Sequence, residues 1–340
     1  RLAAGALAGL ALALSAAVAA RPGDLDPSFG TGGVYAPAPY QANEFVAAGT
    51  GAAERWVTGS VSRGGASHLF VAKLTAAGVP DATFGNGGKA MLRWDNASSG
   101  AAIARQADGK IVVAGAAWVG GNTRMLVTRF NADGTLDTGF GTNGVTTVNP
   151  FGYSTATALS IAGDGKILVA GYATLSSSDM VVFRVTTAGA LDATFGTGGV
   201  KVLDFRGGSD FAAGVQALGD GKTLVAGTAA QSSANANFDF AVARLNADGS
   251  VDTNFGYLGH NGLVLYDVGG AYDSAAELGF HGASPVLLGS STRAGETKSE
   301  ISVLKLMAGG LPAPAFGTSG VAFVTAPASL YAARMAVHAD

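Results

Sequence analysis

The sequence contains no cysteine among its 340 residues, so it forms neither a disulfide nor a thiolate metal site. Charged residues make up only 13% of the chain, against roughly 25% in an average globular protein, and the net charge is -3. This composition argues against nucleic-acid binding, which leaves a basic footprint. Four histidines occur without repeated placement or metal-ligand spacing: His68, His260, His281 and His338.

Long hydrophobic runs are also scarce, with one exception near the start of the chain. Residues 2–20 are rich in Ala and Leu, follow Arg1, and end in small residues before Arg21-Pro22. This pattern predicts a secretory signal peptide over residues 1–20 and one repeat domain over residues 21–340. The alternative is a retained membrane anchor, because the run approaches the ~20 residues that span a bilayer. We therefore expect a secreted, periplasmic or cell-surface protein without a membrane span after signal cleavage.

Glycine is abundant, and much of it belongs to a repeat. A Phe-Gly pair recurs at intervals of 55 to 61 residues, at Phe29, Phe84, Phe140, Phe195, Phe255 and Phe316. An Asp stands three residues before each Phe except the last, where Ala313 takes its place. Such periodicity indicates a repeat architecture. We expect each Phe to fill the space between neighbouring repeats.

A second landmark lies between two apolar runs inside the period: Asp108-Gly109-Lys110, Asp164-Gly165-Lys166 and Asp220-Gly221-Lys222. Asp-Gly in this setting predicts a hairpin with a type I′ turn, in which both central residues have positive φ. Glu54-Arg55 and residues 281–285 replace this turn in the other two periods. With four short strands and no amphipathic helix per period, we predict an all-β propeller of four-stranded antiparallel blades. A β-helix or solenoid is the alternative.

Two further patterns order the strands within a blade. The strand before the Asp-Gly turn is rich in small residues and is expected nearest the propeller axis, with the Gly-Gly-Val strand outermost. The third strand carries one basic residue, which we expect to pair with the Asp before the Phe: Lys73, Arg129, Arg184, Arg244 and Lys305. Counting strands gives five complete blades and an incomplete sixth, made of an outer strand at 32–35 and an inner strand at 330–337. The same strand count places the last residues of the chain at a hairpin turn, and we expect the chain to be cut there.

The stretches 164–171 and 246–252, together with Phe255-Gly256, resemble the delta-60 repeat, a family of bacterial β-propeller-like repeats. The resemblance covers residues 25 to 340. It implies an exported or surface-associated propeller, often part of a longer protein with adhesion or sorting modules. No common activity or catalytic residue set comes with it.

The sequence nominates no catalytic, cofactor-binding or metal-binding residue outright. Asn131-Ala132-Asp133-Gly134 and Asn246-Ala247-Asp248-Gly249, followed by Asp137 and Asp252, gather oxygen atoms that could hold calcium. Ordinary turns favour the same residues, because Asn and Asp side chains bond to their own backbone. We therefore predict no cofactor, with calcium as the open alternative.

For function we predict a non-enzymatic binding, adhesion or display module that meets a protein or carbohydrate through loops of variable length. These loops are 117–124, 173–179, 229–237 and 291–299. One alternative is a hydrolase or lyase acting on carbohydrate or peptide at the channel, for which Arg105, Glu277 and Arg334 are the candidate ionisable residues. Another is a structural spacer in a longer surface protein.

Overall fold

The computed structural model describes residues 42–332, apart from 52–53, 95, 175, 233–234, 258–260 and 327. All regular elements in this part of the chain are strands, which form five four-stranded antiparallel sheets. The all-β prediction is thus confirmed. The predicted signal peptide and the strand at 32–35 lie outside the described residues, as do residues 333–337 of the last predicted strand.

We number the sheets 1 to 5 in chain order. Sheet 1 comprises β1 (Ala42–Gly51), β2 (Glu54–Arg63), β3 (Ala66–Thr75) and β4 (Lys89–Met91). Sheet 2 comprises β5 (Ser98–Arg105), β6 (Ile111–Val119), β7 (Asn122–Phe130) and β8 (Val145–Val148). Sheet 3 comprises β9 (Tyr153–Ile161), β10 (Ile167–Thr174), β11 (Ser178–Val185) and β12 (Val200–Leu203). Sheet 4 comprises β13 (Asp210–Ala217), β14 (Thr223–Ser232), β15 (Asn235–Leu245) and β16 (Leu263–Tyr266). Sheet 5 comprises β17 (Gly270–His281), β18 (Ser284–Arg293), β19 (Ser299–Lys305) and β20 (Val321–Val324).

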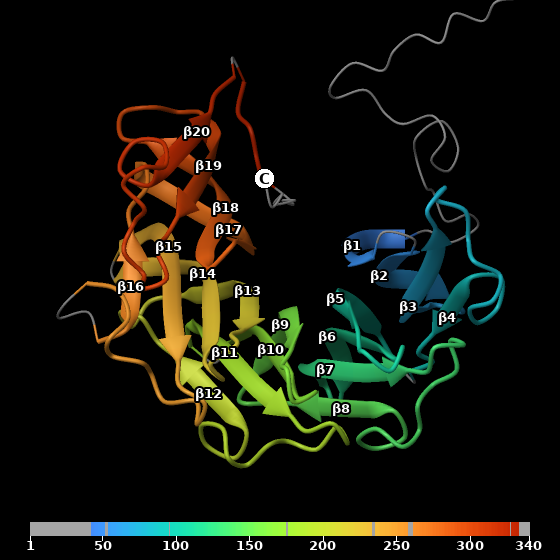
Figure 1. Ribbon diagram of the computed structural model, residues 1–340. Helices are drawn as coiled ribbons and strands as arrows, with labels where there is room; N and C mark the ends of the chain where they lie inside the picture. Colours follow the sequence, from blue (N-terminus) through green and yellow to red (C-terminus); the bar gives the residue numbers. More distant parts are fainter. Residues whose placement is uncertain are drawn as a thin grey trace, which may run out of the picture.

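The sheets follow one another around a common axis, as blades of a propeller do (Figure 1). The first strand of each sheet, β1, β5, β9, β13 or β17, lies nearest the axis, and the fourth lies at the periphery. Both placements agree with the sequence-based prediction. Small side chains suit the inner strands because successive inner strands contact one another around the axis.

In each sheet the pairing between the inner strand and the second strand contains a shift in register. The second strand has a glycine near this shift. In sheet 3 the pairing shifts between Ala170 and Gly171. A Cβ atom added to Gly171 would lie 2.0 Å from the carbonyl oxygen of Thr155. Gly115, Gly227 and Gly289 face the same strand in their own sheets at 1.9 to 2.4 Å. The glycine that ends the apolar run after each hairpin therefore lets two backbones approach closely.

Gly171→Ala should lower the free energy of unfolding by about 2 kcal/mol, because the added methyl group forces the inner strand outward. Gly163→Ala is the matched control, since a Cβ there meets nothing within 4 Å. We expect the control to change stability by less than about 0.5 kcal/mol. Urea unfolding followed by circular dichroism measures both. Equal stability of the two variants would contradict the close approach.

The Asp-Gly-Lys hairpins form as predicted, but the turn type differs. Only the glycines have positive φ, with 87° at Gly109, 79° at Gly165 and 82° at Gly221. The carbonyl of Gln106 accepts a hydrogen bond from Gly109 N at 3.0 Å, and Gln106 N donates to Lys110 O at 2.8 Å. This is a type I turn followed by a left-handed glycine bulge, so the type I′ prediction is wrong. The Asp avoids positive φ and accepts a bond from the Lys backbone N–H instead.

The repeated Phe lies between consecutive sheets, as the sequence predicted. Four copies are fully buried: Phe84, Phe140, Phe195 and Phe255. After Phe195, Gly196 N donates to the carbonyl of Asp248, in a turn of sheet 4, at 2.7 Å. A Cβ on Gly249 of that turn would meet the Phe195 ring at 3.1 Å. The Phe-Gly loop of each sheet is thereby covered by a turn of the next.

In sheets 1 to 4 the basic residue of the third strand pairs with the Asp before the Phe, as predicted. The prediction is wrong for Lys305 of sheet 5, because Ala313 replaces the Asp and Lys305 Nζ lies 3.3 Å from His281 Nδ1 instead. Arg184 Nε lies 2.8 Å from Asp192 Oδ2, and Lys166 of the hairpin turn approaches the same oxygen at 3.1 Å. Arg129 and Arg244 repeat the pair with Asp137 and Asp252. Arg184 also donates to the carbonyl of Ala247 in the next sheet at 2.7 Å. These polar contacts link consecutive sheets beside the buried Phe.

Candidate functional site

The two loops predicted as calcium sites use their oxygen atoms within the fold. Asp133 Oδ1 accepts hydrogen bonds from the N–H and the hydroxyl of Thr135, at 2.9 and 2.7 Å. Asp248 does the same with Ser250. Asp137 and Asp252 are ion-paired with Arg and Lys. These side chains form ordinary turns and sheet-to-sheet links, and the alternative that these loops hold calcium stays a prediction.

A cavity of about 690 Å³ opens at the axis, on the side where the inner strands begin. Its walls are the small residues of four inner strands, including Gly100, Ala156, Ala212 and Ala276. Its rim carries Trp118, Tyr153 and Tyr172. Because the inner strands present small side chains where they line the cavity, the cavity stays open, and aromatic rings border it.

Two of the rim aromatics, Tyr153 and Tyr172, belong to a longer row, which we call the aromatic arc: Tyr153, Tyr172, Phe211, Phe238 and Tyr272. Neighbouring ring centroids lie 5.0 to 6.4 Å apart, within the range of favourable aromatic contacts. Tyr153 and Tyr272, at the two ends, are 45% and 49% exposed. The arc thus runs across sheets 3, 4 and 5 and offers ring surface to solvent.

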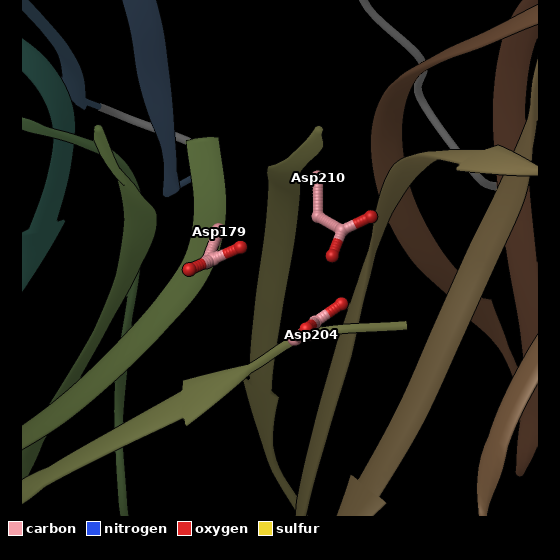
Figure 2. A group of neighbouring side chains, drawn as sticks. All are labelled: Asp179, Asp204 and Asp210. Atoms are coloured by element: carbon pink, nitrogen blue, oxygen red, sulfur yellow. The ribbon is translucent and has the colours of Figure 1, made fainter. Parts of the chain in front are cut away.

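Two groups of aspartates lie at the end of the sheets where the inner strands begin. The first acidic group is Asp179 on β11, Asp204 directly after β12, and Asp210 at the start of β13. One carboxylate oxygen from each lies within 4.8 Å of the other two. Figure 2 shows the three carboxylates turned toward one another between the strands. Each group is close enough to hold a metal ion.

The second acidic group, Asp239, Asp267 and Asp273, occupies the corresponding positions one sheet further on. Asp239 lies on β15, Asp267 directly follows β16, and Asp273 lies near the start of β17. One carboxylate oxygen from each of these three residues again lies within 4.8 Å of the other two. The acidic arrangement is therefore repeated at two consecutive junctions between sheets.

Burial dominates the electrostatics of both groups. Asp210 is fully buried; Phe205 N donates to its Oδ2 at 2.9 Å, and its Oδ1 has no hydrogen-bond partner. Burial, together with the charges of Asp204 and Asp179, raises the pKa of Asp210 to about 7 against the single opposing hydrogen bond. Burial likewise raises the pKa of Asp273 to about 6, although Val268 N and Gly269 N donate to it.

In sheets 2 and 3 a serine stands where sheets 4 and 5 have a buried aspartate. Ser98 Oγ accepts a hydrogen bond from Leu69 N at 3.0 Å, and Ser154 Oγ accepts one from Met125 N at 3.2 Å. Each serine thus accepts a hydrogen bond from a backbone N–H in the third strand of the preceding sheet. Asp210 and Asp273 bond to the connecting loop instead. At this position the first two junctions between sheets have a neutral serine, and the next two junctions have a carboxylate.

The ionisable residues nominated for the channel do not meet these groups. Arg105 ends β5, at the opposite end of the inner strand from Ser98, and lies 3.8 Å from Glu54. Glu277 lies within β17, and Arg334 lies outside the described residues. Of the histidines, His281 Nδ1 lies 3.3 Å from Lys305 Nζ, and His68 lies near Arg63 and Arg93. His260 and His338 lie outside the described part.

The variable loops are hairpins between the second and third strands, and they border the acidic groups. Asp179 is the last residue of the 173–179 loop, and Asp239 follows the 229–237 loop by two residues. Sequence reasoning noted the loops and missed the aspartates. A signal was present, because Asp204 and Asp210 have the same six-residue separation as Asp267 and Asp273.

Comparison with known families supports the repeat. A family described as "Domain of unknown function (DUF5122) beta-propeller" matches residues 106–140, 162–195 and 218–255. The chain therefore contains β-propeller-like repeats, while the delta-60 name stays a prediction. No curated protein matches the sequence. In the described residues, we find no helix with the length and apolar character needed to cross a membrane.

Several solved structures resemble the chain. The GH43 endo-arabinanase from Bacillus licheniformis is 12% identical, with a TM-score of 0.37 over 78% of this chain and 96% of that one. An exo-1,5-alpha-L-arabinanase from a bovine ruminal metagenomic library is 12% identical, with a TM-score of 0.38 over 78% and 92%. Drosophila Plexin A, in complex with Semaphorin 1b, is 10% identical, with a TM-score of 0.41 over 78% and 52%.

The functional prediction needs correction in the light of these structures. Proteins titled as glycoside hydrolases or glycosidases predominate among them. They contradict the prediction of a non-enzymatic binding, adhesion or display module, and the alternative of a hydrolase sited at the channel agrees with them better. The likeness itself is one of fold, so any site must be argued from this chain's own residues.

Proposed function

We propose that this protein is an exported hydrolase acting on a carbohydrate chain that lies along the aromatic arc at the mouth of the axial cavity. The arc is the observation that carries the proposal. Sugar rings present apolar C–H faces, and a row of partly exposed aromatic rings provides flat surfaces for several of them in succession. The cavity of about 690 Å³ falls within the roughly 300–1,000 Å³ usual for ligand sites.

The reaction requires carboxyl groups near the bound chain. Glycoside hydrolysis generally uses a pair of carboxyls, one to protonate the leaving oxygen and one to assist attack on the sugar. Asp204 and Asp267 are the exposed members of the two acidic groups. We assign one proton-transfer role to the exposed residue of each group, with a neighbouring carboxylate of the same group, whose oxygen lies within 4.8 Å, as its partner. The buried Asp210 and Asp273 cannot touch a substrate directly.

The substrate class follows from the charges at the rim. Six aspartates gather in the two acidic groups beside the arc. An acidic polysaccharide would be repelled there, whereas a neutral one would not. We therefore propose a neutral glycan as substrate, and export follows from the predicted signal peptide over residues 1–20.

The test is release of reducing sugar from a panel of neutral polysaccharides, including arabinan and mannan, with polygalacturonate as the acidic comparison. Asp204→Asn combined with Asp267→Asn should lower the rate at least ~100-fold, the usual contribution of acid–base groups. Tyr272→Ala should weaken retention of the same polysaccharide in affinity electrophoresis. Asp108→Asn, in a hairpin turn at the other end of the strands, is the matched control. Absence of hydrolysis across the neutral panel, or an active double variant, refutes the proposal.

A further inference from the structure

We infer that each acidic group is a divalent-cation site, and that calcium bound there joins two neighbouring sheets. The two groups include Asp204 and Asp267, which the proposed hydrolysis also uses, but the inference is argued from the buried carboxylates and is tested without any carbohydrate. It places the ion at the junction of sheets 3 and 4 for the first group, and of sheets 4 and 5 for the second.

The spacing of the oxygen atoms fits calcium. Calcium binds oxygen ligands at about 2.3–2.6 Å, so two atoms on opposite sides of one ion lie up to about 5 Å apart. The oxygen atoms of each group lie within 4.8 Å of one another. The oxygen ligands come from three separate segments, which suits the flexible coordination of calcium better than the near-ideal octahedron that magnesium demands.

The buried carboxylate of the first group supplies an independent reason for a ligand. Asp210 is 0% exposed, and its Oδ1 has no hydrogen-bond partner. Its carboxylate lies beside those of Asp179 and Asp204 (Figure 2). A buried carboxylate oxygen left unpaired is costly. At the equivalent junctions of sheets 2 and 3, Ser98 and Ser154 avoid that cost by accepting a backbone N–H. An ion at the first group would satisfy the free oxygen of Asp210.

Charge balance points the same way. Three of the aspartates that link consecutive sheets beside the repeated Phe, Asp137, Asp192 and Asp252, each have an Arg and a Lys partner. Among the described residues, neither acidic group forms an ion pair with a Lys or Arg side chain. In the first group three carboxylates therefore converge without a paired protein cation, whereas in the second group the charge of Arg206 acts on Asp239 without forming an ion pair. A divalent ion supplies the missing positive charge.

The ligands also come from both sides of the junction. Asp179 and Asp204 belong to sheet 3 and its exit loop, whereas Asp210 begins sheet 4. Asp204 is exposed, which gives an ion a route from solvent, and its Oδ1 already accepts a bond from Gly207 N. Binding would fix the loop between the two sheets as well as the sheets themselves. The second group repeats this arrangement through Asp267 and Gly270 N.

The experiment is calorimetric titration of the chelator-treated full chain with calcium chloride, in the absence of any carbohydrate. We expect two calcium ions per chain, with Kd below ~1 mM. Thermal unfolding should shift upward by about 5 °C at a calcium concentration 100 times Kd. Magnesium chloride at the same concentration should shift it much less.

Asp210→Asn and Asp273→Asn should each remove one of the two ions, and the double variant should bind none. Asp108→Asn should keep both. Circular dichroism checks that each variant folds, and the wild-type stoichiometry decides the question even where one does not. No calcium binding by the wild type, or unchanged stoichiometry in a folded double variant, overturns the inference. Because no sugar is present, neither result depends on the hydrolase proposal.

Discussion

Replacing Arg184 by Met should lower the free energy of unfolding by about 3 kcal/mol, the usual result of breaking a buried ion pair from one side. The Arg184 side chain is only 10% exposed and its partner Asp192 7%. The change removes the ion pair, the bond to Ala247 of the next sheet, and the contact of the guanidinium with Phe195 at 4.7 Å. Asp192 keeps Lys166 and Thr194 but loses its closest cation. Urea unfolding measures the loss.

Arg105→Met is the matched control, because Arg105 is half exposed and lies 3.8 Å from Glu54. An exposed pair of this kind contributes at most ~1 kcal/mol. If both variants lost the same stability, the special position of Arg184 would be refuted.

The Arg184 effect should also depend on pH. Burial by itself raises the pKa of Asp192, but hydrogen bonds from Thr194 and Lys166 and the charge of Arg184 outweigh it and hold that pKa well below its usual range. A lowered pKa in the folded state stabilises the fold above the unfolded-state pKa of about 3.9 and loses this effect as acid protonates the carboxylate. The difference between wild type and Arg184→Met should therefore shrink as pH falls below about 4. A difference that stayed constant with pH would mean that lost packing, and not charge, explains it.

Phe195→Ala should lower the free energy of unfolding by about 4 kcal/mol, since removing a buried aromatic ring leaves a cavity that the surroundings fill only in part. Phe195 is fully buried beneath the turn of sheet 4 that contains Gly249. The ring also lies below the Arg184 guanidinium. Its loss thus weakens the contact between sheets 3 and 4 as well as the core of sheet 3. Differential scanning calorimetry gives the change in unfolding temperature and enthalpy.

Phe316→Ala provides the matched control from the same repeat position. Phe316 is only partly buried, and Ala313 replaces the Asp that precedes the other copies. We expect this variant to lose less than half as much stability as Phe195→Ala. Equal losses would show that the fully buried position between sheets 3 and 4 has no special importance.

The fold could be predicted because its determinants recur. Phe195, Asp192 and Gly165 each belong to a motif present several times, and repetition separates structural residues from chance. The ion pair of Arg184 with Asp192 followed from the same register. The turn type did not, because Asp-Gly suits both a type I′ turn and a type I turn with a glycine bulge. Backbone hydrogen bonds settle that choice, and they are not legible in the residue letters.

The acidic groups were harder to predict for a different reason. Asp179, Asp204 and Asp210 lie in three separate segments, and they meet only when one sheet packs against the next. The aromatic arc has the same character, since Tyr172 and Phe211 come from neighbouring sheets and occupy no repeated motif. Side chains that differ between otherwise equal repeats carry the candidate site. The acidic groups recur at only two junctions, so a search for residues common to every repeat passes over them.

The covering of each Phe-Gly loop by a turn of the following sheet has a consequence for how such a chain can evolve. Gly141 N, Gly196 N and Gly256 N all donate to the sheet that comes next in the sequence, and Arg129, Arg184 and Arg244 reach in the same direction. Each repeat thus has one side that donates hydrogen bonds to the next repeat and one side that accepts them from the previous repeat. Duplication or loss of one gene segment of this length would leave matching surfaces at the new joint. The number of repeats can therefore change during evolution without the need for a new kind of contact between them.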